Sequence, residues 1–239
     1  MEFFTLSIAA LITGLSKFSV GGMGMLIAPI LLTTFPAHTV LGILLPIYLI
    51  TDVMVVLSYR TNIDWGVILK IIPAQLIGMT LASLLMANMS LDFLPKLIGF
   101  MIIFMILIGF WIEYHNTNFM KRKSSIHGTG LIAGIVAMTA NAGGPFISLI
   151  LLEQNLKKVS YVSTRAWCFL FIDIGKIPLI ISLGYINTDT IKISIQSIPA
   201  LLLGSLIGFI LLRNIKTKHF KWIIRILSAL AASNLILYG

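Results

Sequence analysis

The sequence contains a series of apolar runs, most of them long enough to cross a membrane as a helix. After an initial glycine-interrupted stretch, they extend over about 39–59, 65–87, 93–111, 159–183, 191–212 and 222–238. A helix needs roughly 20 apolar residues to cross the hydrocarbon core of a bilayer. Because the runs are continuous rather than alternating, they favour helices over a β-barrel. The chain is therefore predicted to be an all-α, polytopic integral membrane protein.

Composition excludes several other classes of protein. Hydrophobic residues make up 58% of the 239 residues and charged residues 10%, whereas soluble globular domains carry roughly 25% charged residues. The net charge of +9 is concentrated in short loops between apolar runs, which indicates membrane topology rather than nucleic-acid binding. The single Cys168 and four scattered histidines have no metal-ligand spacing. No metal, cofactor or nucleic-acid partner is expected.

Two apolar segments are interrupted by glycines. They read SVGGMGMLIAPILL over 19–32 and MTANAGGPFISLILL over 138–152. The first lies within a run from Phe3 to Phe35, which is too long for one straight crossing of the bilayer. Each part flanking its glycines, at roughly 12 to 14 residues, is too short to cross alone. A break or turn is therefore predicted in each segment.

The two halves of the chain repeat each other. Residues 11–14 (LITG) match 131–134 (LIAG), and 72–78 (IPAQLIG) match 198–204 (IPALLLG). Two matches in the same order predict an internal duplication within a single transmembrane domain, 1–239. The repeats are expected at about 1–118 and 124–239, with a basic linker at about 113–127.

Basic residues in the loops indicate how the segments are oriented. Arg60, the 121–123 cluster, the 157–158 pair and the 213–221 cluster all lie on one side if the two glycine-broken segments are re-entrant. Each half then has one re-entrant segment and three crossings, about eight membrane segments in total, and the halves are inverted. Secondary transporters use this architecture. The alternative, two kinked full crossings with parallel repeats, stays open.

The helix that follows each glycine break is predicted to start in the membrane interior. The first amides of a helix lack intrahelical partners and lie at the positive end of its dipole, so two such helix starts form an anion site. The alternative is that the glycines only allow close helix packing. The residues predicted to bind substrate here are Gly21, Gly22, Gly24, Asn141, Gly143, Gly144 and Pro145.

Four ionisable residues fall inside the apolar segments, where each is costly and therefore suggests function. Lys17 and Lys176 are predicted to bind the anion, and Asp52 and Asp173 are candidates for proton coupling. Asp173 and Lys176 are three residues apart and can pair on one helix face. Asp52 can pair with Lys17 or titrate, and the sequence does not choose. Arg165 is interpreted as an anchor at the membrane interface.

These segments together resemble the sulfite exporter TauE/SafE family. The resemblance covers nearly the whole chain, through GGMGMLIAPILL, LPIYLITD, IPAQLIG, MTANAGGPFISLILL, TRAWCFLFIDIGKIPL and IPALLLG. It implies a bacterial membrane transporter of two related halves that moves sulfite, sulfonates or related small anions. It also supports the assignment of the glycine segments and Lys176 to an anion site.

The expected function is secondary transport of a small anion, sulfur-containing or organic, across the cytoplasmic membrane by a multi-pass protein. Its expected partners are the anion and the lipid bilayer, and the sequence leaves homo-oligomerisation open. Two alternatives are an intramembrane aspartyl hydrolase using Asp52 and Asp173, and a non-transporting membrane scaffold.

Overall fold

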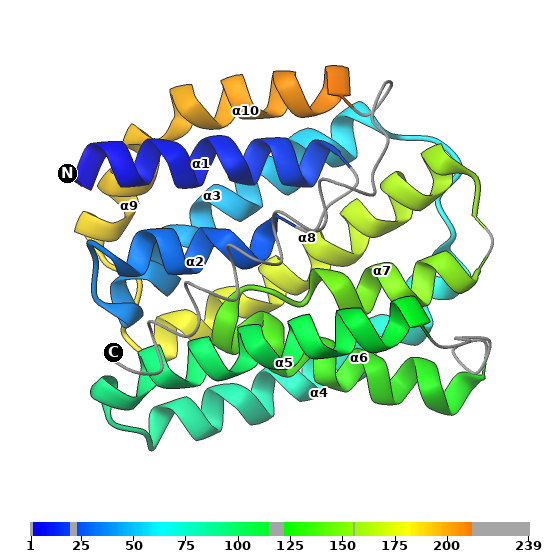
Figure 1. Cartoon of the computed structure of the whole chain (residues 1–239), viewed down its shortest axis with the longest axis horizontal. Helices are drawn as coiled ribbons and strands as arrows, with labels where there is room; N and C mark the ends of the chain where they lie inside the picture. Colours follow the sequence, from blue (N-terminus) through cyan, green and yellow to red (C-terminus); the bar gives the residue numbers. More distant parts are fainter. Residues whose placement is uncertain (1, 20–22, 115–121, 155, 212–239) are drawn as a thin grey trace.

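The computed structural model of the chain describes residues 2–19, 23–114, 122–154 and 156–211 (Figure 1). These residues form helices without any strand, as the apolar runs predict. The helices are α1 (Glu2–Phe18), α2 (Gly24–Leu32), α3 (Ala37–Ser58), α4 (Trp65–Ala87), η1 (Leu91–Phe93), α5 (Leu94–Tyr114), α6 (Lys123–Ala140), α7 (Gly144–Glu153), α8 (Lys158–Ser182), α9 (Thr188–Gln196) and α10 (Ile198–Leu211).

Within the described residues, three helical stretches are long and apolar enough to cross a membrane. They are Ala37–Ser58, Trp65–Ala87 and Leu91–Ile108, the last formed by η1 and the first part of α5. The bent pair of α9 and α10 is a possible fourth. Helix α8 is 25 residues long but carries Lys158, Arg165, Asp173 and Lys176, so it is less uniformly apolar. The predicted segment at 222–238 lies outside the described residues.

The run at 191–212, predicted as one apolar span, is divided in its described part into α9 and α10, with a bend of 48° between them at Ser197. Pro199 has no N–H to donate to the preceding turn. The hydroxyls of Ser194 and Ser197 also donate to the carbonyls of Thr190 and Ser194, and such bonds bend helices. The matching Pro73 lies within the continuous helix α4, so proline alone does not break the helix.

The stretch predicted as a linker is partly helical. Helix α5 continues to Tyr114 and α6 begins at Lys123, both inside the expected linker at 113–127. Residues 115–121 of this stretch lie outside the described part of the chain. The linker at about 113–127 therefore stays a prediction, and its two ends are helical.

Both glycine-broken segments fold into helical hairpins. Figure 1 shows α1 and α2 running in opposite directions, and α6 and α7 doing the same. Helices α2 and α7 have nine and ten residues, so each is about 14–15 Å long, half of a typical hydrocarbon core. At the second turn Asn141 has φ of 51°, a left-handed conformation that asparagine tolerates, and it ends α6. Both short helices start near the middle of the molecule and run to opposite ends.

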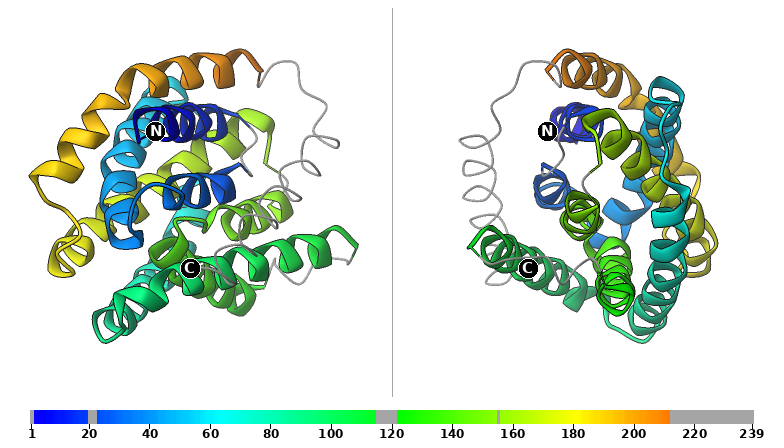
Figure 2. Two further views of the ribbon diagram at one scale, coloured as in Figure 1. Left: turned by 60° about the vertical axis from the view of Figure 1, so that its left-hand side comes forward. Right: turned by 90° about the vertical axis from the view of Figure 1, so that its right-hand side faces the viewer.

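The first helix of the first half packs along the last described helix of the second half. Helices α1 and α10 lie side by side in Figures 1 and 2. A Cβ on Gly14 would overlap the backbone around Leu201, and a Cβ on Gly204 would overlap the carbonyl of Leu11. The two backbones therefore approach closely because both positions are glycine.

The same contact recurs between α4 of the first half and α6 of the second half. A Cβ on Gly134 would overlap the carbonyl of Gln75, and a Cβ on Gly78 would overlap that of Leu131. These four residues match Gly14, Leu201, Gly204 and Leu11 in the sequence alignment of the halves. The motifs that match between the halves are thus the places where each half packs against the other.

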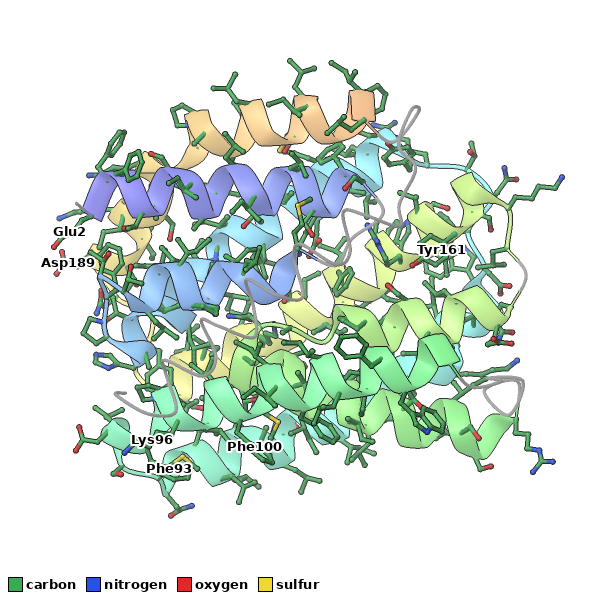
Figure 3. The ribbon with its side chains drawn as sticks, in the orientation of Figure 1. Glu2, Phe93, Lys96, Phe100, Tyr161 and Asp189 are labelled. Atoms are coloured by element: carbon green, nitrogen blue, oxygen red, sulfur yellow. The ribbon has the colours of Figure 1, made fainter. Side chains whose placement is uncertain are left out.

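The outward faces of α4, α5 and α10 are apolar. Phe100 of α5, labelled in Figure 3, is 59% exposed. Exposed leucines and isoleucines continue along α4 and α10, at Leu69, Leu76, Ile77, Leu81, Leu84, Leu85, Leu202, Leu203, Leu206, Ile207 and Ile210. An apolar exterior of this extent is expected where lipid rather than water surrounds the helices.

The close helix contacts predict a specific sensitivity to one added methyl group. We expect Gly134→Ala to destabilise the protein by about 1–3 kcal/mol, because its Cβ has no space against the α4 backbone. Gly128→Ala is the matched control in the same helix, since nothing lies within 4 Å of its added Cβ. Thermal unfolding of both variants in detergent measures the difference. Equal melting temperatures would contradict the proposed close contact.

Candidate functional site

A cavity of about 60 Å³ lies where the two helical hairpins meet α3 and α8. A water molecule needs roughly 10–15 Å³ by this kind of measure, so the cavity has room for a small ligand. It is lined by Ser16, Lys17, Gly24, Ile27, Tyr48, Ala137, Asn141, Ala142, Gly143, Gly144, Pro145, Ser148, Arg165, Phe169, Ile172, Asp173 and Lys176. Polar and charged groups are therefore brought together inside a largely apolar bundle.

The starts of both short helices reach this cavity. Gly24 is the first residue of α2 and Gly144 the first of α7, and both line the cavity. Met23, which precedes α2, gives no side-chain cap to its amides. Pro145 lies in the first turn of α7, where its missing N–H is tolerated. Two positive dipole ends thus converge on one small space.

Buried charged side chains form a continuous chain beside the helix starts. The Lys17 Nζ lies 2.6 Å from Asp52 Oδ1 and 3.1 Å from Asp173 Oδ2. The Lys176 Nζ lies 2.8 Å from Asp173 Oδ1 and donates to Asn141 Oδ1, also at 2.8 Å. Asp52, Asp173 and Lys176 are each at most 3% exposed. The pairing that the spacing of Asp173 and Lys176 allows is present, and of the alternatives for Asp52 the structure has the pairing with Lys17.

Aromatic rings hold Lys17 from two further sides. Its Nζ lies 4.3 Å from the centre of the Tyr48 ring and 5.2 Å from that of Phe169, distances at which rings attract cations. The Tyr48 hydroxyl is buried and has no hydrogen-bond partner among the described residues. Tyr48 was not predicted as a site residue, although its position four residues before Asp52 places both on one face of α3.

Arg165 is also part of the site. Its guanidinium donates to the carbonyl oxygens of Lys17 at 3.1 Å and Ser19 at 2.7 Å, and the residue is 3% exposed. The interpretation of Arg165 as an interface anchor is therefore wrong. Carbonyls at the C-terminal end of a helix lack intrahelical partners and carry partial negative charge, which explains why α1 attracts a cation there.

The site carries an excess of positive charge. Lys17, Arg165 and Lys176 contribute three cations, whereas Asp52 and Asp173 contribute two carboxylates, so the net formal charge of this group is one positive. Because the cavity is small and lies inside a largely apolar bundle, this charge is weakly screened. A negative ligand is favoured there.

Most of the predicted site residues lie together. Asp52 reaches the cavity through Lys17. Gly21 and Gly22 lie outside the described residues. Within the described ranges no group of three or more His, Cys, Asp or Glu is placed to hold a metal. The predicted residues that line the cavity are Lys17, Gly24, Asn141, Gly143, Gly144, Pro145, Asp173 and Lys176.

An apolar helical bundle that encloses two half-length helices and a buried charged cavity defines an integral membrane protein with an internal polar site. The chain belongs to the sulfite exporter TauE/SafE family, whose model matches residues 6–235. It is therefore a membrane transport protein and not an enzyme. Comparison with curated proteins and with solved structures gave no match.

The position of Lys17 predicts a large effect on stability. We expect Lys17→Met to destabilise the protein by about 3–5 kcal/mol, because Asp52 loses its counter-charge in a buried position. Adding Asp52→Asn to that variant removes the unpaired carboxylate and should restore part of the loss.

The matched control is Lys192→Met. The Lys192 Nζ lies 3.8 Å from Asp189 Oδ1, and both side chains are mostly exposed, so its loss should change the melting temperature little. If Lys17→Met and Lys192→Met shift the melting temperature equally, the buried pair does not have the stabilising role argued above.

Proposed function

We propose that the protein is a secondary transporter that carries a small anion, sulfur-containing or organic, such as sulfite or a sulfonate. The single observation that carries the proposal is the convergence of two helix N-termini and three cations, the buried Arg165 and Lys176 and the partly buried Lys17, on one cavity. Family membership supports transport, and the cavity supports the negative charge of the substrate. The sequence has no P-loop motif, so the proposed drive is an ion or solute gradient.

The groups around the cavity suit recognition of an oxyanion. Backbone amides at the starts of α2 and α7 can donate hydrogen bonds to a negatively charged oxygen. Lys17, Arg165 and Lys176 add positive charge. The Tyr48 hydroxyl is a further donor without a partner among the described residues. Phe169 and Ile172 supply apolar walls that keep these interactions out of water.

We further propose that the two hairpins are re-entrant and that the halves are inverted repeats with about eight membrane segments. Glu2, Phe93, Lys96 and Asp189 lie towards one end of the molecule and Tyr161 towards the other (Figure 3). The end of α3 before Arg60, the start of α6 at Lys123 and the start of α8 at Lys158 lie on the Tyr161 side (Figure 1), which the positive-inside rule assigns to the cytoplasm. The return paths of α2 and α7 support re-entrance over kinked full crossings.

This arrangement suggests how the anion crosses. The site lies between the hairpins of the two halves, and each half packs against the other through the glycine contacts of α1 with α10 and α4 with α6. Rocking of one half against the other would open the site to each side of the cytoplasmic membrane in turn.

An aspartyl hydrolase is disfavoured as an alternative. In such enzymes two carboxylates share a proton and activate water. Here Lys17 contacts both Asp52 and Asp173, and Lys176 contacts Asp173, so two ammonium groups balance the charge of the two carboxylates. The exporter family gives no support for hydrolysis either.

Transport is tested with the purified chain in proteoliposomes. We expect saturable uptake of at least one of sulfite, thiosulfate, isethionate and a small carboxylate. Lys176→Gln should lower uptake about 10-fold or more at a limiting anion concentration, because a hydrogen bond to a charged group contributes about 1.5–3 kcal/mol. Lys192→Gln, at an exposed position, should transport normally. Folded protein that moves none of these anions would refute the proposal.

Topology is tested separately by cysteine labelling. The only native cysteine, Cys168, is buried, so Cys168→Ala gives a suitable background. Cysteines introduced at Arg122 and Lys157 should react with an impermeant reagent from the same side of the membrane, and one at Lys192 from the opposite side. Labelling of Arg122 and Lys157 positions from opposite sides would show that the α6–α7 segment crosses fully.

A further inference from the structure

The two buried carboxylates of the site have unequal partners. Asp173 is contacted on both oxygens, on Oδ1 by Lys176 at 2.8 Å and on Oδ2 by Lys17 at 3.1 Å. Asp52 is contacted only on Oδ1, by Lys17 at 2.6 Å. Its Oδ2 is buried and has no partner among the described residues. Asp173 is thus held by two cations and Asp52 by one.

We propose that Asp52 is the proton-binding carboxylate of the transport cycle and that Lys17 couples its protonation to anion binding, whereas Asp173 stays ionised as an anchor for the two lysines. This inference rests on the proposed function of the site as an anion carrier. It separates two residues that the sequence treats as equivalent candidates, since they lie at matching places in α3 and α8.

Among the groups that surround Asp52, Lys17 is the one that mainly controls its protonation. Helices α2 and α10, which pack on α3, contain no titratable side chain. Helices α5 and α9 also pack on α3, and Lys96 near the start of α5 and Asp189 and Lys192 of α9 are exposed. The charged or titratable groups around Asp52 are Lys17 from α1, Asp173 and beyond it Lys176 and Arg165 from α8, and Tyr48 from α3 itself.

The Lys17 ammonium faces both Asp52 and the cavity. An anion in the cavity competes with Asp52 for this ammonium, because Lys17 lines the cavity and holds Asp52 at the same time. As Lys17 turns towards the anion, Asp52 loses the one counter-charge that it has among the described residues. A buried carboxylate without a counter-charge is unfavourable, and Asp52 becomes neutral by taking a proton from the side of the membrane to which the site is then open.

The coupling is reciprocal. If a bound anion favours protonation of Asp52, then protonation of Asp52 favours anion binding by the same factor. When the anion leaves on the other side, Lys17 returns to Asp52 and the proton is released there. Anion and proton therefore move in the same direction, whichever way their gradients drive them. Lys176 keeps Asp173 ionised throughout, since its contact does not involve Lys17.

The experiment uses proteoliposomes with a pH-sensitive dye inside and thiosulfate as the probe if it is transported, because its charge is constant near neutral pH. Wild type should show proton entry only when the anion is added outside. Asp52→Asn should retain exchange of external for internal anion but lose this anion-dependent proton entry. Asp173→Asn should lose both anion exchange and anion-dependent proton entry. Asp189→Asn, which changes an exposed carboxylate, should behave as wild type.

Each result has a distinct meaning. Anion-dependent proton entry that survives in Asp52→Asn overturns the inference and leaves anion transport intact. Loss of exchange in folded Asp52→Asn also overturns it, since Asp52 would then be part of the anion site. If Asp52→Asn does not fold, anion flux without proton entry in wild type still overturns the inference, because it excludes coupling. Absence of flux of every anion tested in wild type instead refutes the proposed function.

If thiosulfate is not carried but isethionate is, isethionate replaces it as the probe, since its charge is also constant near neutral pH.

Discussion

The ammonium of Lys17 contacts two carboxylates from two different helices, and much of the inner structure depends on that contact. Asp52 of α3 and Asp173 of α8 would repel each other across an apolar interior without it. The backbone at the end of α1 is in turn held by Arg165 of α8. Helices α1, α3 and α8 are therefore joined by charge at the centre of the molecule, beside a cavity whose remaining surface is largely apolar.

Around this charged centre, the scaffold is held by contacts without charge. Helix α1 of the first half lies along α10 of the second half, and α6 of the second half lies along α4 of the first. Glycines stand at the closest points of both contacts. In lipid the hydrophobic effect does not drive helices together, so close van der Waals packing has to stabilise these contacts. The two halves thus share one frame but differ in their polar residues: Ala137 stands where the first half has Lys17, and Val55 where the second half has Lys176.

The sequence predicted the parts of the fold that depend on length and on local chemistry. The apolar runs predicted α3, α4, α5 and α8 to within a few residues, since a membrane demands long apolar helices. The i, i+3 spacing predicted the contact of Asp173 with Lys176. The bend at Ser197 was not predicted, because hydroxyl bonds within a helix leave no mark on hydropathy. The role of Arg165 was missed for another reason: its partners are carbonyls of residues nearly 150 positions earlier in the chain, and such contacts depend on tertiary structure.

The crossed packing of the halves also affects how the chain is made. Gly14 meets its partner Leu201 only after a further 187 residues have been synthesised. During most of translation α1 is inserted without the helix that covers its glycine face, and Lys17 lacks Asp173 over nearly the same interval. The first half of the polypeptide thus depends on the second for its final structure. Neither half is expected to persist as a separate folded unit, and truncation within α10 would leave α1 exposed to quality-control proteases.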